Sequence, residues 1–172
     1  MKKMVITATA VLALGLGMPL AHAADVQTAG TQTGTGYFGV YTGWPDAIGA
    51  QYTLTGTFGS GSYLRFGIGI PAFYQAFGVD LSGDALFDTV RFGDQGKMRL
   101  GGGLSIGFLN SDNHFTHDSN TFAYPHFLAN FSMMFNPHLQ GFVEPEVGPL
   151  FVSRGYGTTG RVAVKVGLNF TP

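Results

Sequence analysis

The sequence contains no cysteine, and only 11% of its 172 residues carry a charge. Without cysteine the chain has no disulfide, no thiolate nucleophile, no cysteine ligand for zinc and no cysteine for a lipid anchor. The charges nearly cancel, leaving a formal net charge of -1. Because nucleic-acid-binding proteins carry a basic surplus, we expect no nucleic-acid partner.

Long apolar runs are missing after the N-terminal segment, which has the pattern of a secretory signal. Lys2 and Lys3 precede an apolar stretch from Val5 to Leu16 that is too short to span a bilayer, and Ala21-His22-Ala23 is a small-residue cleavage motif. We therefore expect three parts: a signal peptide at residues 1–23, a flexible leader at residues 24–35 and one barrel domain at residues 36–172.

Apolar residues alternate with small or polar ones along most of the remaining chain. In the segment RLGGGLSIGF, Leu100 and Ile106 lie in the apolar phase, whereas Arg99, Ser105 and three glycines lie in the other. A period of two places successive side chains on opposite faces of a sheet. The pattern predicts eight strands, at residues 36–42, 47–58, 63–74, 85–92, 99–108, 121–135, 139–152 and 161–170.

Turn-forming residues separate these strands. Short connections (GSGS, GDQGK and NPH) alternate with longer ones (GVDLSGD, NSDNHFTHDSN and SRGYGTTG). Short turns at one end of a sheet and longer loops at the other are typical of a meander that closes on itself. The sequence therefore predicts an all-β, eight-stranded, antiparallel, up-and-down barrel.

The glycines decide which face of this barrel points inward. The chain has 27 of them, many on the polar phase. Glycine weakens a strand on a water-facing surface, but a narrow lumen needs small residues to leave room for the few long ones. The apolar phase would then face lipid, so we favour a transmembrane barrel over a soluble one.

The last strand, RVAVKVGLNF, has the apolar phase Val162, Val164, Val166, Leu168 and Phe170. In size, strand pattern and this terminal strand, the chain resembles the small eight-stranded outer-membrane barrels typified by the OmpX family and the OmpA transmembrane domain. One difference is that Thr171 and Pro172 follow the terminal aromatic residue. The resemblance implies an outer-membrane location, contact with membrane lipid and recognition of the C-terminal strand by the barrel-assembly machinery.

Charged residues on the inward phase are the candidate site. The four basic members are Arg65, Arg99, Arg161 and Lys165, and the two acidic members are Glu144 and Glu146. An ion removed from water needs a partner, and an eight-stranded lumen is filled by side chains. We expect these six residues to form a polar network that plugs the lumen, with Glu146 diagonal to Lys165.

Other groupings carry weaker signals. Asp112, His114, His117 and Asp118 share one loop and are of types that bind divalent metals, but a solvated loop is the favoured interpretation. Ser132, His126 and Glu144 or Glu146 could form a catalytic set, although no local motif holds them together. GYGTTG matches a nucleotide-binding pattern, yet no helix follows it.

The function predicted is that of an integral outer-membrane barrel with a structural or surface-interaction role. We expect no enzymatic activity, no cofactor and no metal, and the sequence does not identify a surface partner. Two alternatives stay open: a soluble periplasmic barrel that binds an apolar ligand, and a barrel enzyme that acts on envelope lipid.

Overall fold

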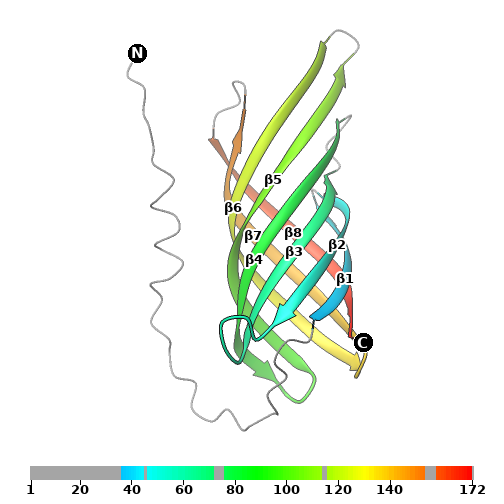
Figure 1. Cartoon of the computed structure of the whole chain (residues 1–172), viewed down its shortest axis with the longest axis vertical. Helices are drawn as coiled ribbons and strands as arrows, with labels where there is room; N and C mark the ends of the chain where they lie inside the picture. Colours follow the sequence, from blue (N-terminus) through cyan, green and yellow to red (C-terminus); the bar gives the residue numbers. More distant parts are fainter. Residues whose placement is uncertain (1–35, 45, 72–75, 114–115, 154–157, 172) are drawn as a thin grey trace, which may run out of the picture. The chain divides into compact units, whose positions relative to one another are not determined.

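The computed structural model describes residues 36–44, 46–71, 76–113, 116–153 and 158–171, and these residues form a closed antiparallel β-barrel (Figure 1). The eight strands are β1 (Gly36–Trp44), β2 (Asp46–Thr55), β3 (Ser62–Pro71), β4 (Ala76–Phe92), β5 (Gly96–Asn113), β6 (Thr116–Asn136), β7 (Leu139–Val152) and β8 (Thr158–Phe170). None of the described residues belongs to a helix long and apolar enough to cross a membrane.

Each strand pairs with the next one along the chain, and β1 closes the barrel on β8. The closing pair runs from Phe38 opposite Phe170 to Trp44 opposite Val164. Every pairing is antiparallel, and the strands keep their chain order around the barrel. The predicted eight-stranded up-and-down barrel is therefore confirmed.

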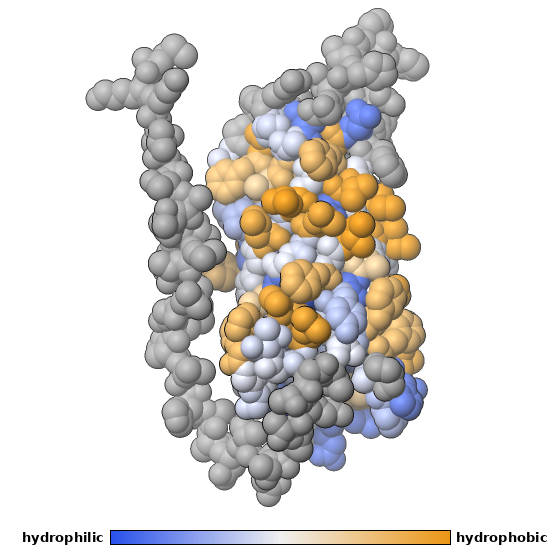
Figure 2. Space-filling model, viewed as in Figure 1, coloured by the Kyte–Doolittle hydropathy of each residue, from blue (hydrophilic) through white to orange (hydrophobic). Residues whose placement is uncertain are grey.

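The two faces of the wall differ in character. Ile68 is 51% exposed on the outer face, whereas Arg65, on the inner phase of the same strand, is 2% exposed. Figure 2 shows apolar side chains in a broad band over the wall, with hydrophilic ones nearer the ends of the barrel. Large apolar residues on all eight strands share this exposure. The barrel thus buries its polar phase and exposes its apolar phase.

Strand β4 corrects one prediction. Residues 78–84 were expected to be a connection, but they lie inside β4, where Asp80 and Asp84 are buried and Leu81 is exposed. This segment has the composition of a turn because most of its glycine, serine and aspartate residues face a narrow interior, where small and polar side chains fit. Most of residues 110–120 also lie in strands, since β5 runs to Asn113 and β6 begins at Thr116.

Prolines interrupt the pairing of β6 with β7. The pairing passes from Ala123 opposite Phe151 directly to Phe127 opposite Val147, so that Pro125 and Pro149 face each other without a ladder pair. Proline has no N–H to donate to a neighbouring strand. The pairing of β7 with β6 is therefore interrupted near these prolines, whereas β7 itself is continuous.

Glycine at position 101 lets neighbouring strands fill the interior. Gly101 pairs with Leu86 on β4 and Leu128 on β6, and those two leucines pack with Tyr63 in a small buried apolar cluster. A Cβ at position 101 would collide with the backbone oxygen of Ala85. Because the obstacle is backbone, the strand itself would have to move.

Replacing Gly101 by alanine is expected to lower the free energy of unfolding by about 1–3 kcal/mol, the usual range for overpacking. Gly83 is the matched control, since a Cβ there meets nothing within 4 Å. Gly83→Ala should be neutral or stabilise by up to about 1 kcal/mol. Denaturant titration of the two variants in detergent or lipid would contradict this account if both lost equal stability.

Candidate functional site

Charged and polar side chains gather inside the barrel, where the strands project their inner phase toward one another. Buried members with an acidic, basic or imidazole group are Arg65, Asp80, Asp84, Arg99, His126, Glu144, Glu146, Arg161 and Lys165. They come from six strands, β3 to β8. The interior is therefore the candidate functional site.

Arg65 binds two carboxylates at once. Its Nη1 and Nη2 donate to the two oxygens of Glu144 at 2.6 and 2.7 Å, and its Nε and Nη2 donate to Oδ2 of Asp84 at 2.9 and 2.8 Å. Paired, charge-assisted hydrogen bonds of this kind are the strong ones in proteins. Glu144 lies on β7 and Asp84 on β4, so this guanidinium connects three strands across the lumen.

Further hydrogen bonds extend from both carboxylates. Asp84 Oδ1 contacts Nε2 of His126 at 2.9 Å, and Asn130 donates its amide to Glu144 at 2.8 Å. Arg99 donates to the Asn130 side chain at 3.3 Å and to Asp88 at 3.1 Å. A continuous chain of contacts thus runs from Asp88 through Arg65 to His126.

Aromatic rings cover several of the cations. The guanidinium of Arg99 lies 4.3 Å from the centre of the Tyr63 ring, and that of Arg161 lies 4.6 Å from the centre of the Tyr124 ring. Cations over ring faces are attracted by the ring quadrupole, more so when water is excluded. Tyr63 also donates a hydrogen bond from its hydroxyl to Asp88 at 3.2 Å. Tyr63 therefore contacts both members of the Arg99–Asp88 ion pair.

Lys165 and Glu146 form a separate buried ion pair. Lys165 lies directly opposite Glu144 in the β7–β8 pairing, which places Glu146 on the diagonal, and its ammonium group is 2.6 Å from the Glu146 carboxylate. The same ammonium group is 5.2 Å from the centre of the Tyr41 ring. This is the diagonal arrangement that simple β7–β8 register predicts.

Uncharged side chains cross the lumen in another layer. Gln51 donates to Asn169 at 3.0 Å, and Asn169 donates to Gln140 at 3.1 Å, which links β2, β8 and β7. All three are buried. Amides can donate and accept together, so they satisfy one another without adding charge.

The structure places all six sequence-predicted residues in the interior and adds others. Sequence reasoning missed Asp84, Asp88, His126 and Asn130 as network members. Asp84 was hidden in the expected connection, although its alternation with Leu81 and Gly83 was a usable signal. His126 and Asn130 were visible as inward polar residues, but nothing in the sequence paired them with particular partners. Asp88 shares its phase in the sequence with the apolar Leu86 and Val90, so it was not visible as an inward residue.

The candidate catalytic set is not brought together. His126 contacts Asp84 and the carbonyl of Tyr124, whereas Ser132 contacts Arg99 and the carbonyl of Lys97. The candidate metal ligands at positions 112, 114, 117 and 118 lie outside the described side chains. GYGTTG lies partly outside the described residues, and its described end begins β8.

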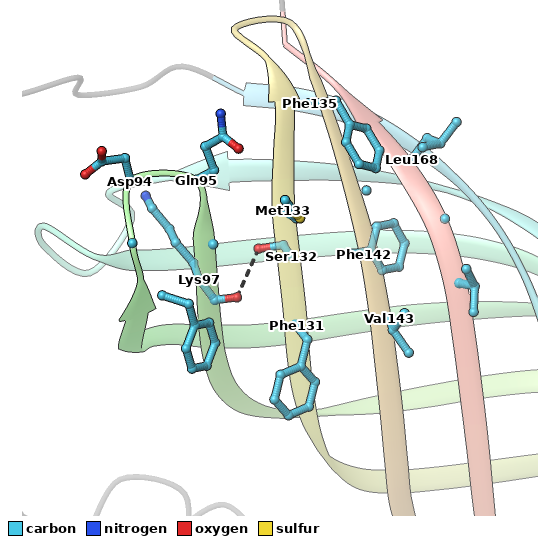
Figure 3. Close-up of a pocket in the computed structure, with 16 residues that line it drawn as sticks. Asp94, Gln95, Lys97, Phe131, Ser132, Met133, Phe135, Phe142, Val143 and Leu168 are labelled. Carbon is cyan, nitrogen blue, oxygen red and sulfur yellow. Dashed lines mark hydrogen bonds between the residues drawn. The ribbon is translucent and has the colours of Figure 1, made fainter.

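A second feature is a hollow of about 900 Å³ beside the turn between β4 and β5 (Figure 3). Its lining is mainly apolar and includes Phe131, Phe135 and Phe142. The figure shows Ser132 bonded to the Lys97 carbonyl there rather than directed at an acid and a base. The hollow therefore offers apolar contact but no catalytic arrangement among its described residues.

The fold and its interior define a class: small, closed, eight-stranded antiparallel barrels with an apolar outer wall and a charged lumen. No family model and no curated protein matches the sequence. Two solved structures do match in fold. The N-terminal β-barrel domain of Pseudomonas aeruginosa OprF has a TM-score of 0.62 at 12% identity, covering 80% of this chain and 98% of that one. Neisserial surface protein A has a TM-score of 0.54 at 9% identity, covering 81% of this chain and 96% of that one.

Both of these structures are eight-stranded outer-membrane β-barrels. At identities of 12% and 9%, the likeness establishes the shared fold. The chain is therefore an eight-stranded β-barrel of the architecture that outer-membrane proteins use.

The Glu146–Lys165 pair gives a test of the network. Glu146→Leu is expected to cost about 3–5 kcal/mol of unfolding free energy, because it leaves a buried ammonium group without its partner. The double variant Glu146→Leu with Lys165→Met removes both charges and should be more stable than the single variant. Urea titrations of the refolded barrels would measure the difference. A double variant that is less stable than the single one would contradict the pairing.

Proposed function

We propose that the chain is an integral outer-membrane barrel with a plugged lumen and a structural or surface-interaction role. The observation that supports the proposal most directly is that the barrel exposes its apolar side chains and buries its charged ones, the reverse of a water-soluble protein. Apolar residues such as Phe66 and Ile68 are about half exposed, whereas Arg65 and Glu144 are buried. In water this arrangement would be unfavourable, but in a bilayer the apolar band contacts lipid and the ions pair in the lumen.

Outer-membrane lipid is the partner that this wall would contact. The exposed band includes aromatic and branched aliphatic side chains on every strand. A closed barrel also satisfies its backbone hydrogen bonds internally, as a membrane-spanning sheet must. Strand β8 exposes alternating Val162, Val164, Val166, Leu168 and Phe170, which is the face that the barrel-assembly machinery would read.

The two alternatives have less support. A soluble barrel that binds an apolar ligand needs an apolar interior, whereas the described interior is rich in ions and amides. A lipid-modifying enzyme needs a base with a free lone pair near a nucleophile. Both ring nitrogens of His126 are engaged by oxygen acceptors, and Ser132 contacts other groups.

A charge on the outer wall tests the membrane assignment. If Ile68 faces lipid near the middle of the membrane, Ile68→Arg should cost about 2–4 kcal/mol of folding free energy in a bilayer. Ile68→Leu is the isosteric control, and Ser60→Arg places the same charge in an exposed turn. Both controls should fold like the parent chain in lipid vesicles. Equal tolerance of arginine at positions 60 and 68 would exclude lipid contact at Ile68.

The plug is tested by electrical recording. Purified protein reconstituted in a planar bilayer should show no steady conductance, because bonded side chains from β3, β4 and β7 cross the lumen. The measurement needs proof of insertion, for example protection of the barrel from added protease in matched vesicles. A steady conductance from correctly inserted, unmodified protein would refute the plug and indicate a transport function.

A further inference from the structure

His126 is held between two hydrogen-bond acceptors. Its Nδ1 lies 3.0 Å from the carbonyl oxygen of Tyr124, and its Nε2 lies 2.9 Å from Oδ1 of Asp84. A carbonyl oxygen can only accept, so Nδ1 must carry a proton. Nε2 then also needs a proton unless the Asp84 carboxyl supplies one.

Asp84 is poorly placed to supply that proton. Its other oxygen, Oδ2, accepts two hydrogen bonds from Arg65, which is the geometry of an ionised carboxylate paired with a guanidinium. Protonating Asp84 would weaken that ion pair in a place that excludes water. Instead, both hydrogen bonds of the imidazole ring have a donor and an acceptor when His126 carries both ring protons and Asp84 carries a full negative charge.

The surrounding charges agree with a cation at this position. Arg65, Asp84, Glu144 and His126 are joined by direct or shared hydrogen bonds, and a charged imidazole makes two cations for two carboxylates. Two further groups of charge lie nearby. Lys165 of β8 pairs with Glu146 of β7. Arg161 of β8 lies over the Tyr124 ring, which stacks on His126. The facing positions of β5, Gly103 and Ser105, carry no charge.

Gly103 makes the contact possible. In the sheet, Asp84 of β4 pairs with Gly103 of β5, which pairs with His126 of β6. The two side chains meet by crossing the intervening strand on its inner side. A Cβ at position 103 would collide with Oδ1 of Asp84, the atom that contacts His126. Only glycine leaves this path open.

We propose that His126 is a buried imidazolium at neutral pH and that the Asp84–His126 pair is a pH-sensitive clasp between β4 and β6. A neutral ring keeps only one of these two protons, so one ring nitrogen would become an acceptor that faces another acceptor, either the Asp84 carboxylate or the Tyr124 carbonyl oxygen, and the clasp would weaken. The stabilisation is present while His126 is protonated and disappears as pH rises through its deprotonation. This inference depends on the barrel fold and not on whether the lumen conducts.

Nuclear magnetic resonance on the full chain tests the protonation state. With ¹⁵N-labelled histidine in detergent, both ring nitrogens of His126 should give protonated signals at pH 7.5. The resonance is assigned by elimination, using a chain in which His22, His114, His117 and His138 are all replaced by glutamine, so the assignment does not require changing His126. A neutral ring with one unprotonated nitrogen would overturn the proposal, even if the lumen proves to be plugged.

A stability series tests the clasp itself. His126→Gln keeps an amide that can donate to Asp84 but cannot carry a charge, and His138→Gln, in an exposed turn, is the control. The stability advantage of the parent over His126→Gln should shrink as the pH is raised from about 7 into the alkaline range, in the direction expected when the folded state holds the proton. An advantage that stays constant across this range, with His138→Gln also unchanged, would overturn the proposal. If His126→Gln fails to fold, the ring-nitrogen signals of the parent histidine decide the proposal, because that measurement leaves His126 unchanged.

Discussion

The guanidinium of Arg65, placed between Asp84 and Glu144, is the interaction on which the interior depends. These three groups come from β3, β4 and β7, and all are almost fully removed from solvent. Burying any one of them alone would be costly, because a low-dielectric interior penalises an unpaired charge severely. Each carboxylate therefore has an ionised partner and at least one further donor, from His126 or Asn130. The pairing holds opposite sides of the wall at a set distance.

The glycines follow from the same constraint. Long charged side chains that meet across a narrow barrel need space, and the intervening strand must supply it by having no side chain of its own. Gly101 lies between Leu86 and Leu128, and Gly103 lies between Asp84 and His126. The glycine-rich face of β5 is thus the counterpart of the large residues on β4 and β6. Substitution there would change the packing of three strands together.

The outer wall completes this arrangement. Because the interior is filled by ions, amides and aromatic rings, the apolar phase has nowhere to be buried within the chain itself. Exposed residues such as Phe66, Phe127 and Val162 then require an apolar surrounding, and a lipid bilayer supplies one. The proposed membrane location and the charged lumen are therefore two consequences of one alternating pattern.

The period-two alternation was enough to predict the strand count, the antiparallel meander and which residues share a face, because these depend on local side-chain direction alone. It failed at residues 78–84, where inward-facing Asp80, Ser82 and Asp84 have the composition of a turn. Partners could be inferred only within one hairpin, as for Glu146 and Lys165. The contacts of Arg65 with Glu144 and of His126 with Asp84 join strands that are not neighbours, and these depend on the tilt and stagger of the closed barrel. Sequence by itself determined the faces of the strands, whereas the tertiary structure decided which charges meet, because register around a closed sheet is a property of all eight strands together.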